Sequence, residues 1–130
     1  MTSPSLGDPV ARALAYLECV RRLDTAAMLD FYAPGARVWL PGQGWMEPAG
    51  LAALLDGARS LLADGIRFTH EDSFAAGNRA VVLTACDSPL KKGGSYVNQF
   101  CFIITFDEAG QITTLREYTD SGPAVAAFHS

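Results

Sequence analysis

Cysteine and histidine are scarce in this sequence, which holds three cysteines and two histidines in 130 residues. None of them stands at the spacing of a metal-ligand motif, so we expect no bound metal. The cysteine count is odd, there is no CxxC pair, and Cys101 lies between two phenylalanines. Such neighbours are typical of small buried thiols in a reducing compartment, which predicts free cysteines in a cytoplasmic protein. His129, one residue from the end, is expected to be exposed.

Clustered positive charge is also missing. The formal net charge is -4, and the adjacent basic pairs, Arg21–Arg22 and Lys91–Lys92, are far apart in the sequence. Because a nucleic-acid-binding surface needs clustered lysine and arginine, we expect no nucleic-acid partner. No apolar run approaches the roughly 20 residues that span a bilayer, and Met1–Ser5 lacks the basic and apolar segments of a secretory signal. We therefore expect no membrane association.

Sequence motifs that hold phosphate or activate a nucleophile are absent as well, since there is no Gly-rich phosphate loop, no GxSxG and no HExxH. What the sequence has in quantity is apolar residues: 49% are hydrophobic and 18% are charged. In 130 residues that balance is enough to bury a continuous core, and no linker, repeat or low-complexity tract interrupts it. We predict one folded domain over residues 1–130, with no cofactor.

Three helices are predicted in the first half of the chain. Each begins at a capping residue or a proline, and its apolar residues fall three or four positions apart. The signals, in chain order, are Asp8–Pro9 for the first helix, Asp24 and Pro34–Gly35 for the second, and Pro48 and Asp64–Gly65 for the third, with a short strand, Ala36–Leu40, and a loop, Pro41–Pro48, before the third.

After Gly65 the hydrophobic period changes from that of a helix to that of a strand. Four strands are predicted, and the turns between them contain glycine. They are Ile66–Phe74, Arg79–Asp87, Tyr96–Phe106 and Gln111–Asp120. The alternation places two sets of side chains each on one face of its strand: Ile66, Phe68, His70, Asp72 and Phe74 in the first strand, and Tyr96, Asn98, Phe100, Phe102, Ile104 and Phe106 in the third. Helices followed by an antiparallel meander predict an α+β fold. Whether Thr84 and Cys86 or Leu83 and Ala85 line the cavity enclosed by such a fold stays open.

Both faces of the predicted sheet are apolar. The helices can cover one face, and the other carries residues that could pack against a second copy of the chain, namely Val81, Leu83, Val97, Cys101 and Ile103. We therefore expect a homodimer that forms through the sheet.

Four segments carry a resemblance to a known family: Tyr16–Glu18, Phe31–Ala36, Phe106–Ile112 and Arg116–Asp120. In this order and spacing they resemble the nuclear transport factor 2-like superfamily, and more closely its SnoaL-like and ketosteroid-isomerase-like branch. The resemblance covers nearly the whole chain. It implies a cone-shaped barrel, in which a curved antiparallel sheet and three N-terminal helices enclose one apolar pocket. Such proteins include isomerases, cyclases, dehydratases, epoxide hydrolases and binding modules, so the fold alone does not fix an activity.

Comparison with the ketosteroid isomerases places Tyr16 at the oxyanion-stabilising tyrosine and Tyr32 at a second tyrosine of the same hydrogen-bond network. The general-base aspartate of that family is replaced by Leu40, and the protonated aspartate of its oxyanion hole by Phe102. Because phenylalanine cannot donate a hydrogen bond, steroid isomerisation by that mechanism is disfavoured. The aspartate–arginine–aspartate set of the epoxide hydrolases is not evident either.

Glu117 is the first candidate for catalysis. In SnoaL-like proteins the segment that matches Arg116–Tyr118 turns its glutamate into the cavity, where desolvation raises the pKa of a carboxyl toward neutrality. The alternative is a glutamate that faces solvent or pairs with an arginine. His70 is the second candidate, since it shares a predicted strand face with Ile66 and Phe68 and could orient Glu117. The alternative is a core histidine, or one at the rim of the sheet.

The remaining candidates would bind the substrate. Asn98 is in phase with Phe100 and Phe102, so all three are expected in the cavity, although Asn98 could instead be satisfied at a strand end. Trp39 and Trp45 flank the loop at the open end of the cone. They are expected to form pocket wall or lid, with core packing and an exposed loop position as the alternatives.

Two functions are compatible with these residues. The first is a cofactor-independent cyclase, isomerase or dehydratase acting on a small, largely apolar metabolite. Glu117 would move the proton with help from His70, while Tyr16 and Asn98 would hold an oxygen of the substrate. The second is a non-catalytic module that binds a small ligand or dimerises. Polar groups that converge in an apolar cavity are costly to bury without a use, which favours the enzyme.

Overall fold

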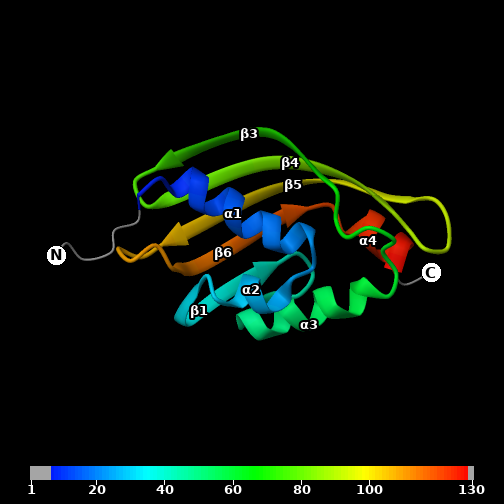
Figure 1. The fold of residues 1–130 in the computed structure, drawn as a ribbon, viewed down its shortest axis with the longest axis horizontal. Helices are drawn as coiled ribbons and strands as arrows, with labels where there is room; N and C mark the ends of the chain where they lie inside the picture. The colour runs from blue at the N-terminus through cyan, green and yellow to red at the C-terminus, as the bar shows by residue number, and fades with distance from the viewer. Residues whose placement is uncertain (1–6, 129–130) are drawn as a thin grey trace.

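The computed structural model describes residues 7–128, so the expectations for Met1–Ser5 and His129 lie outside the described residues. The helices are α1 (Pro9–Arg21), α2 (Thr25–Leu29), α3 (Pro48–Arg59) and α4 (Ser121–Phe128) (Figure 1). The strands are β1 (Tyr32–Leu40), β2 (Gly44–Met46), β3 (Phe68–Ala76), β4 (Arg79–Pro89), β5 (Ser95–Phe106) and β6 (Ile112–Thr119). The predicted α+β class is confirmed.

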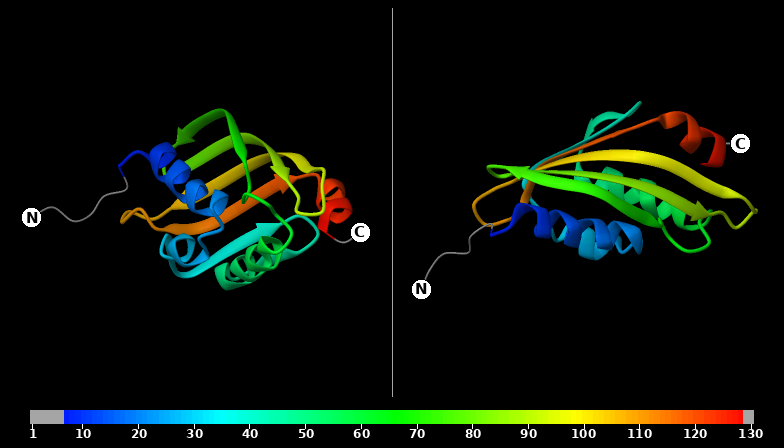
Figure 2. Two further views of the ribbon diagram at one scale, coloured as in Figure 1. Left: turned by 45° about the vertical axis from the view of Figure 1, so that its right-hand side comes forward. Right: turned by 90° about the horizontal axis from the view of Figure 1, so that it is seen from above.

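All six strands form one sheet in the order β2-β1-β6-β5-β4-β3. The pairing of β1 with β6 is parallel, and the other neighbouring strands pair antiparallel. The sheet is twisted and curved, as the two views of Figure 2 show. It wraps partly around the helices as in a cone but does not close into a barrel, because β2 and β3 remain at its two edges within the described residues.

Local sequence signals explain where the first two helices begin. Asp8 accepts a hydrogen bond from the Val10 N–H at 3.0 Å, and Asp24 accepts one from the Ala27 N–H at 3.1 Å. Each carboxylate thereby satisfies a helical N–H that has no partner within its own helix. Both predicted caps are confirmed. The third helix begins at Pro48 as predicted but ends early, at Arg59, because the chain beyond it turns toward β4 and Leu62 forms a bridge with Leu90.

Three features of the fold were not predicted. Strand β1 begins at Tyr32, ahead of the predicted Ala36, and the pairing of β1 with β6 shifts register between Tyr32 and Arg37. The predicted loop contains the short strand β2, which is too brief to show a hydrophobic period. The chain after β6 forms α4, a helix whose small residues give little amphipathic pattern and none of whose residues is buried.

Gly65, in the segment between α3 and β3, lies against the end of α1. Its φ of +60° is a conformation that side-chain-bearing residues rarely adopt, and a Cβ atom there would lie 2.2 Å from the Arg21 carbonyl oxygen. The same oxygen accepts a hydrogen bond from the Ile66 N–H at 3.0 Å. Gly65 therefore fixes α1 relative to the start of β3.

The two faces of the sheet differ in what covers them. We call the side that packs against α1 and α3 the inner face, and the opposite side the outer face. Along β5, the residues predicted to share a face are all buried on the inner side: Tyr96, Asn98, Phe100, Phe102, Ile104 and Phe106. Along β4, Thr84 and Cys86 are buried on this side, which settles the orientation of that strand.

A bulge in β3 overturns one prediction. His70 pairs with Thr84, but the next paired residue, Asp72, lies opposite Leu83, so Glu71 is an extra residue in the strand. One extra residue reverses which side chains face inward. Phe74 therefore lies on the outer face with 52% of its surface exposed, instead of sharing a face with His70 as predicted.

Candidate functional site

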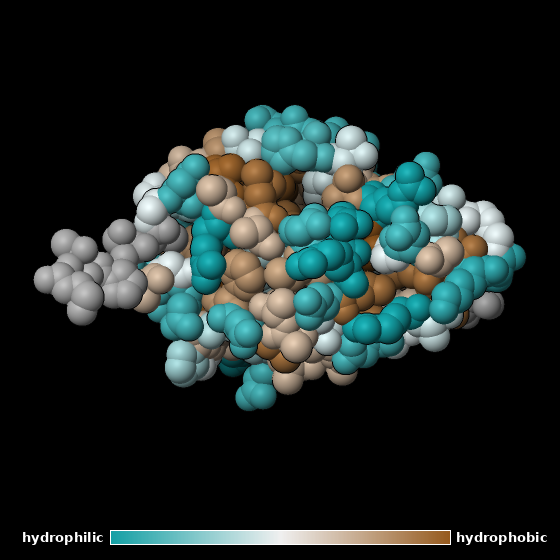
Figure 3. Space-filling model, viewed as in Figure 1, coloured by the Kyte–Doolittle hydropathy of each residue, from teal (hydrophilic) through white to brown (hydrophobic). Residues whose placement is uncertain are grey.

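A cavity of about 470 Å³ lies between the inner face and helices α1, α3 and α4. Figure 3 shows hydrophobic side chains in recesses between hydrophilic ones on the face that carries the helices. Three lining residues carry polar side chains: Tyr16, Tyr96 and Glu117. The others are apolar: Val20, Leu40, Leu51, Ala53, Leu54, Leu55, Gly57, Ala58, Leu61, Leu62, Ile66, Phe68, Phe100, Phe102, Leu115, Ala124 and Phe128. No lysine, arginine or histidine of the described chain lines this space.

Glu117 faces the cavity from β6, opposite Phe102 on β5. Its neighbour Arg116 points to the outer face, as the alternation of a strand requires. Desolvation raises the pKa of the Glu117 carboxyl from its ordinary value of 4.5 to about 7. Among residues 7–128, no group donates a hydrogen bond to this carboxyl and no ion pair neutralises it. The position predicted for Glu117 and the expected direction of its pKa are both found.

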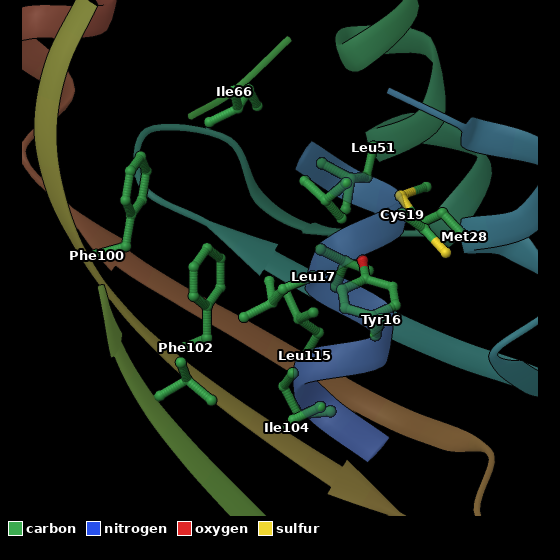
Figure 4. Packing of buried hydrophobic residues seen from close by; sticks show 14 of the residues in the cluster. Tyr16, Leu17, Cys19, Met28, Leu51, Ile66, Phe100, Phe102, Ile104 and Leu115 are labelled. Carbon is green, nitrogen blue, oxygen red and sulfur yellow. The ribbon is translucent and has the colours of Figure 1, made fainter. Parts of the chain in front are cut away.

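Tyr16 reaches the cavity from α1 and is fully buried (Figure 4). Its hydroxyl is hydrogen-bonded to the hydroxyl of Tyr32, and the two rings meet edge to face with centroids 5.5 Å apart. Burial raises the pKa of Tyr16 well above its ordinary value, and the nearby Tyr32 and Glu117 add to the effect. Tyr32 does not line the cavity; it lies behind Tyr16. Burial raises the pKa of Tyr32 as well, so both tyrosines stay protonated at neutral pH.

Phe100 and Phe102 form the floor of the cavity (Figure 4). Their rings are stacked with centroids 5.5 Å apart and planes 13° apart. Phe68 meets both rings edge-on, at 5.7 Å and 6.1 Å. Such a cluster of aromatic side chains suits a ligand that carries a ring. The expectation that Phe100 and Phe102 enter the cavity is confirmed.

Tyr96 is a lining residue that the sequence reasoning missed. It lies on β5 in phase with Phe100 and Phe102, and this phase was the available signal. Its ring contacts Phe128 of α4 at a centroid distance of 4.9 Å. Desolvation raises the pKa of Tyr96 to about 12, although a hydrogen bond from Asn98 acts in the opposite direction. Tyr96 adds a third polar group to the site.

Asn98 is buried but does not line the cavity. Its amide nitrogen donates to the Tyr96 hydroxyl at 2.9 Å and to the Asp120 carbonyl at 2.8 Å. Its amide oxygen accepts from the Gln99 N–H at 2.9 Å. The alternative reading, an amide satisfied at a strand end, is the one that the structure supports. Asn98 meets the cavity through Tyr96 and not directly.

His70 lies outside the cavity, so the predicted pairing of His70 with Glu117 is wrong. His70 sits on the edge strand β3, whereas Glu117 is on β6, with β4 and β5 between them. Three strand spacings separate the two backbones by about 14 Å. The imidazole is exposed, bonds the Ser73 hydroxyl at 2.9 Å, and lines a separate crevice of about 240 Å³ beside α1. This is the sheet-rim position that the sequence left open.

Trp39 and Trp45 are also outside the cavity. They lie opposite each other on β1 and β2, and both face outward because Leu40, one residue along, faces inward. Trp39 packs against Tyr118 with ring centroids 5.1 Å apart, and the Arg116 guanidinium lies 4.7 Å from the centre of the Trp45 ring. The prediction that the tryptophans form pocket wall or lid is therefore wrong. Ala124 and Phe128 of α4 take that place.

Among residues 7–128, no group of three or more histidine, cysteine, aspartate or glutamate side chains is close enough together to hold a metal ion. In the same part of the chain no helix is long and apolar enough to cross a bilayer. The three cysteines are free thiols.

Comparison with known proteins identifies the family. The sequence profile of the SnoaL-like domain matches residues 13–115, which is most of the chain. The protein therefore belongs to the SnoaL-like domain family, within the NTF2-like superfamily, as the resemblance indicated. The match ends two residues before Glu117, so it carries no information on that side chain. No curated protein matches the sequence.

Solved structures share the fold at low sequence identity. A candidate isomerase from Bacillus subtilis is 15% identical with a TM-score of 0.75, over 94% of this chain and 96% of that one. An LEH-like epoxide hydrolase from M. tuberculosis is 15% identical with a TM-score of 0.73, over 93% and 89%. TerC, crystallised with polyporic acid, is 20% identical with a TM-score of 0.75, over 94% and 98%. At these identities the likeness establishes the fold alone.

Proposed function

We propose that this protein is a cofactor-independent enzyme, a cyclase, isomerase or dehydratase, that acts on a small, largely apolar metabolite by general acid–base catalysis. One observation carries the proposal: the Glu117 carboxyl faces an apolar cavity with no hydrogen-bond partner or counter-ion among the described residues, and its pKa is about 7. A general acid or base works best when its pKa is near the operating pH. Burial of an unpartnered carboxyl is costly, which favours a functional reason for it.

The proposed reaction needs no co-reactant. The Glu117 carboxylate removes a proton from a carbon next to a carbonyl group, and the electron pair of the C–H bond moves into the developing enolate. Tyr16, held by Tyr32, donates a hydrogen bond to the oxygen on which negative charge develops. Glu117 then returns the proton to another atom of the substrate. Atoms and electrons balance, so the net result is an isomerisation, and an internal attack by the enolate would give a cyclisation.

The structural relatives support an enzyme at a general level. One is described as an isomerase and another as an epoxide hydrolase, and TerC was crystallised with an organic acid. The epoxide hydrolase chemistry finds less support in this chain, because Glu117 is the one acidic residue that lines the cavity among those described.

The test is exchange of protons next to a carbonyl, which needs no knowledge of the natural substrate. Wild-type protein is incubated in D₂O with 1-tetralone and other cyclic ketones, and the loss of the proton signals is followed by NMR. We expect catalysed exchange that rises as pH increases through about 7 and falls about 10²- to 10⁴-fold in Glu117→Gln. Glu108→Gln, at an exposed turn carboxylate, is the matched control and should keep full activity. Equal exchange by Glu117→Gln and wild type would refute the role of Glu117.

A non-catalytic small-ligand-binding module is the second candidate. The observation that favours it is that Glu117 is the single carboxyl lining the cavity among the described residues, and that His70 lies outside the cavity. A binder would take up cyclic ketones or phenols without exchanging their protons, and affinity that does not change with pH would mean that Glu117 does not meet the ligand.

A further inference from the structure

The hydroxyl proton of Tyr96 has no acceptor among residues 7–128. Tyr96 is 6% exposed and lines the cavity, and its hydroxyl oxygen lies 2.9 Å from the Asn98 amide nitrogen. That nitrogen is the donor, so the hydroxyl group accepts there and its own proton is left over. A buried donor without an acceptor is unfavourable, and an oxygen atom of a bound ligand would relieve the cost.

The orientation of the Asn98 amide determines that its nitrogen donates this hydrogen bond and that the Tyr96 hydroxyl accepts it. Its oxygen accepts from the Gln99 N–H, and its nitrogen donates to the Asp120 carbonyl. A flipped amide would place its nitrogen against the N–H and its oxygen against the carbonyl, and both hydrogen bonds would be lost. The nitrogen therefore faces Tyr96, and the Tyr96 proton has to point elsewhere.

Tyr96 and Glu117 belong to different ends of the cavity. Glu117 lies opposite Phe102, and Tyr96 is six residues earlier on the same strand as Phe102. Six residues of a strand span about 20 Å between backbone positions, a separation that the curvature of the sheet and the two side chains reduce. The stacked rings of Phe100 and Phe102 form the floor between them. Both residues line the same cavity, so one elongated ligand can contact both groups.

We propose that Tyr96 is a specificity-determining residue: its hydroxyl donates to an acceptor oxygen at the end of the substrate remote from Glu117, and Asn98 is its positioning residue. The substrate class is then an elongated, uncharged ring compound with two oxygen functions. An anion is disfavoured because no basic residue of the described chain lines the cavity, and an uncharged substrate suits the otherwise apolar lining. The assignment of Glu117 to the reacting end of the substrate rests on the proposed function. The hydrogen bond from Tyr96 to the other end does not depend on it.

The test uses two ligands of nearly equal shape, 6-methoxy-2-naphthol and 6-ethyl-2-naphthol. The ether oxygen of the first can accept a hydrogen bond, and the matching methylene group of the second cannot. Affinities are measured by calorimetric or fluorescence titration. We expect wild-type protein to prefer the methoxy compound by about fivefold, as one neutral hydrogen bond allows. Tyr96→Phe should lose this preference and still bind the ethyl compound as wild type does.

Further variants separate the roles. Asn98→Asp places an acceptor beside the Tyr96 hydroxyl, which then donates to it, so the preference should fall although the phenol remains. Tyr118→Phe, on the outer face, should keep the preference in full. Glu117→Gln should also keep it while losing proton exchange, so a failure of the proposed function would show in exchange and not in the methoxy preference. An unchanged preference in Tyr96→Phe would overturn the proposal, and so would the lack of binding or preference in wild type.

Discussion

The two faces of the sheet carry similar residues and have different surroundings. Arg116 and Glu117 are adjacent on β6, yet the guanidinium lies in the open over the Trp45 ring while the carboxyl faces an apolar cavity. On β5, Ile104 is fully buried and its neighbour Ile103 is partly exposed. Hydrophobicity alone therefore does not define the site. The helices cover one face, and desolvation on that face raises the pKa of the Glu117 carboxyl.

The largest expected effect uses Ile103 and Ile104, which are of the same type on opposite faces. Ile104→Ala removes packed methyl groups from the core and should lower the free energy of unfolding by about 2–5 kcal/mol. Ile103→Ala should cost less than half as much, because its side chain already contacts solvent. Chemical denaturation of both variants at one low protein concentration measures the difference. Equal costs at that concentration would contradict the assignment of inner and outer faces.

The second prediction concerns the pH dependence of stability. The Glu117 pKa is about 7 in the folded protein and near 4.5 when the chain is unfolded. Below pH 4.5 the group is protonated in both states and does not lower the free energy of unfolding. As pH rises toward and through 7, the unfolded chain ionises first and the folded state loses stability, by about 3 kcal/mol at most. Relative to Glu117→Gln, wild type should therefore become less stable from pH 5 to pH 8.

Urea denaturation of both proteins at several pH values measures this loss. Because the other titrating groups are common to both, their contributions cancel in the difference. Glu108→Gln serves as the control, since its carboxylate is exposed in a turn, and its difference from wild type should stay flat over the same range. A flat difference for Glu117→Gln as well would mean that the carboxyl is not desolvated, and the acid–base proposal would lose its main support.

The sequence was sufficient for most of the fold because the relevant signals are local. The caps at Asp8 and Asp24, and the alternation along β5, each depend on a few neighbouring residues. Glu117 was located through the family resemblance and the strand period together. Along β5, and at Glu117 on β6, these signals predicted side-chain direction correctly.

The parts that failed depend on distant pairing. The extra residue in β3 and the edge position of His70 follow from how β3 pairs with β4, which no local pattern reveals. Trp45 turned outward because its short strand pairs with β1. The role of α4 in closing the cavity was missed because a helix of small residues gives little periodic signal. Tyr96 was visible in the pattern, but its importance depends on the direction of one hydrogen bond.

The smallest predicted effect tests whether the outer face is covered in solution. Large apolar side chains are exposed on it: Phe74 at 52%, Val97 at 57%, Tyr118 at 41% and Trp45 at 42%. We propose that a second copy of the chain packs against this face, since an exposed apolar patch that spans several strands is typical of an interaction surface.

Sedimentation of wild type at micromolar concentration should then give a dimer. Ile103→Glu should weaken that dimer by about tenfold, or roughly 1.4 kcal/mol, because the interface would have to desolvate two carboxylates. Ser60→Glu adds the same charge at the end of α3, away from the sheet, and should leave the dimer intact. A monomer in wild type would contradict the proposed dimer. The outer aromatic surface would then be in contact with solvent, and only the inner face would be covered.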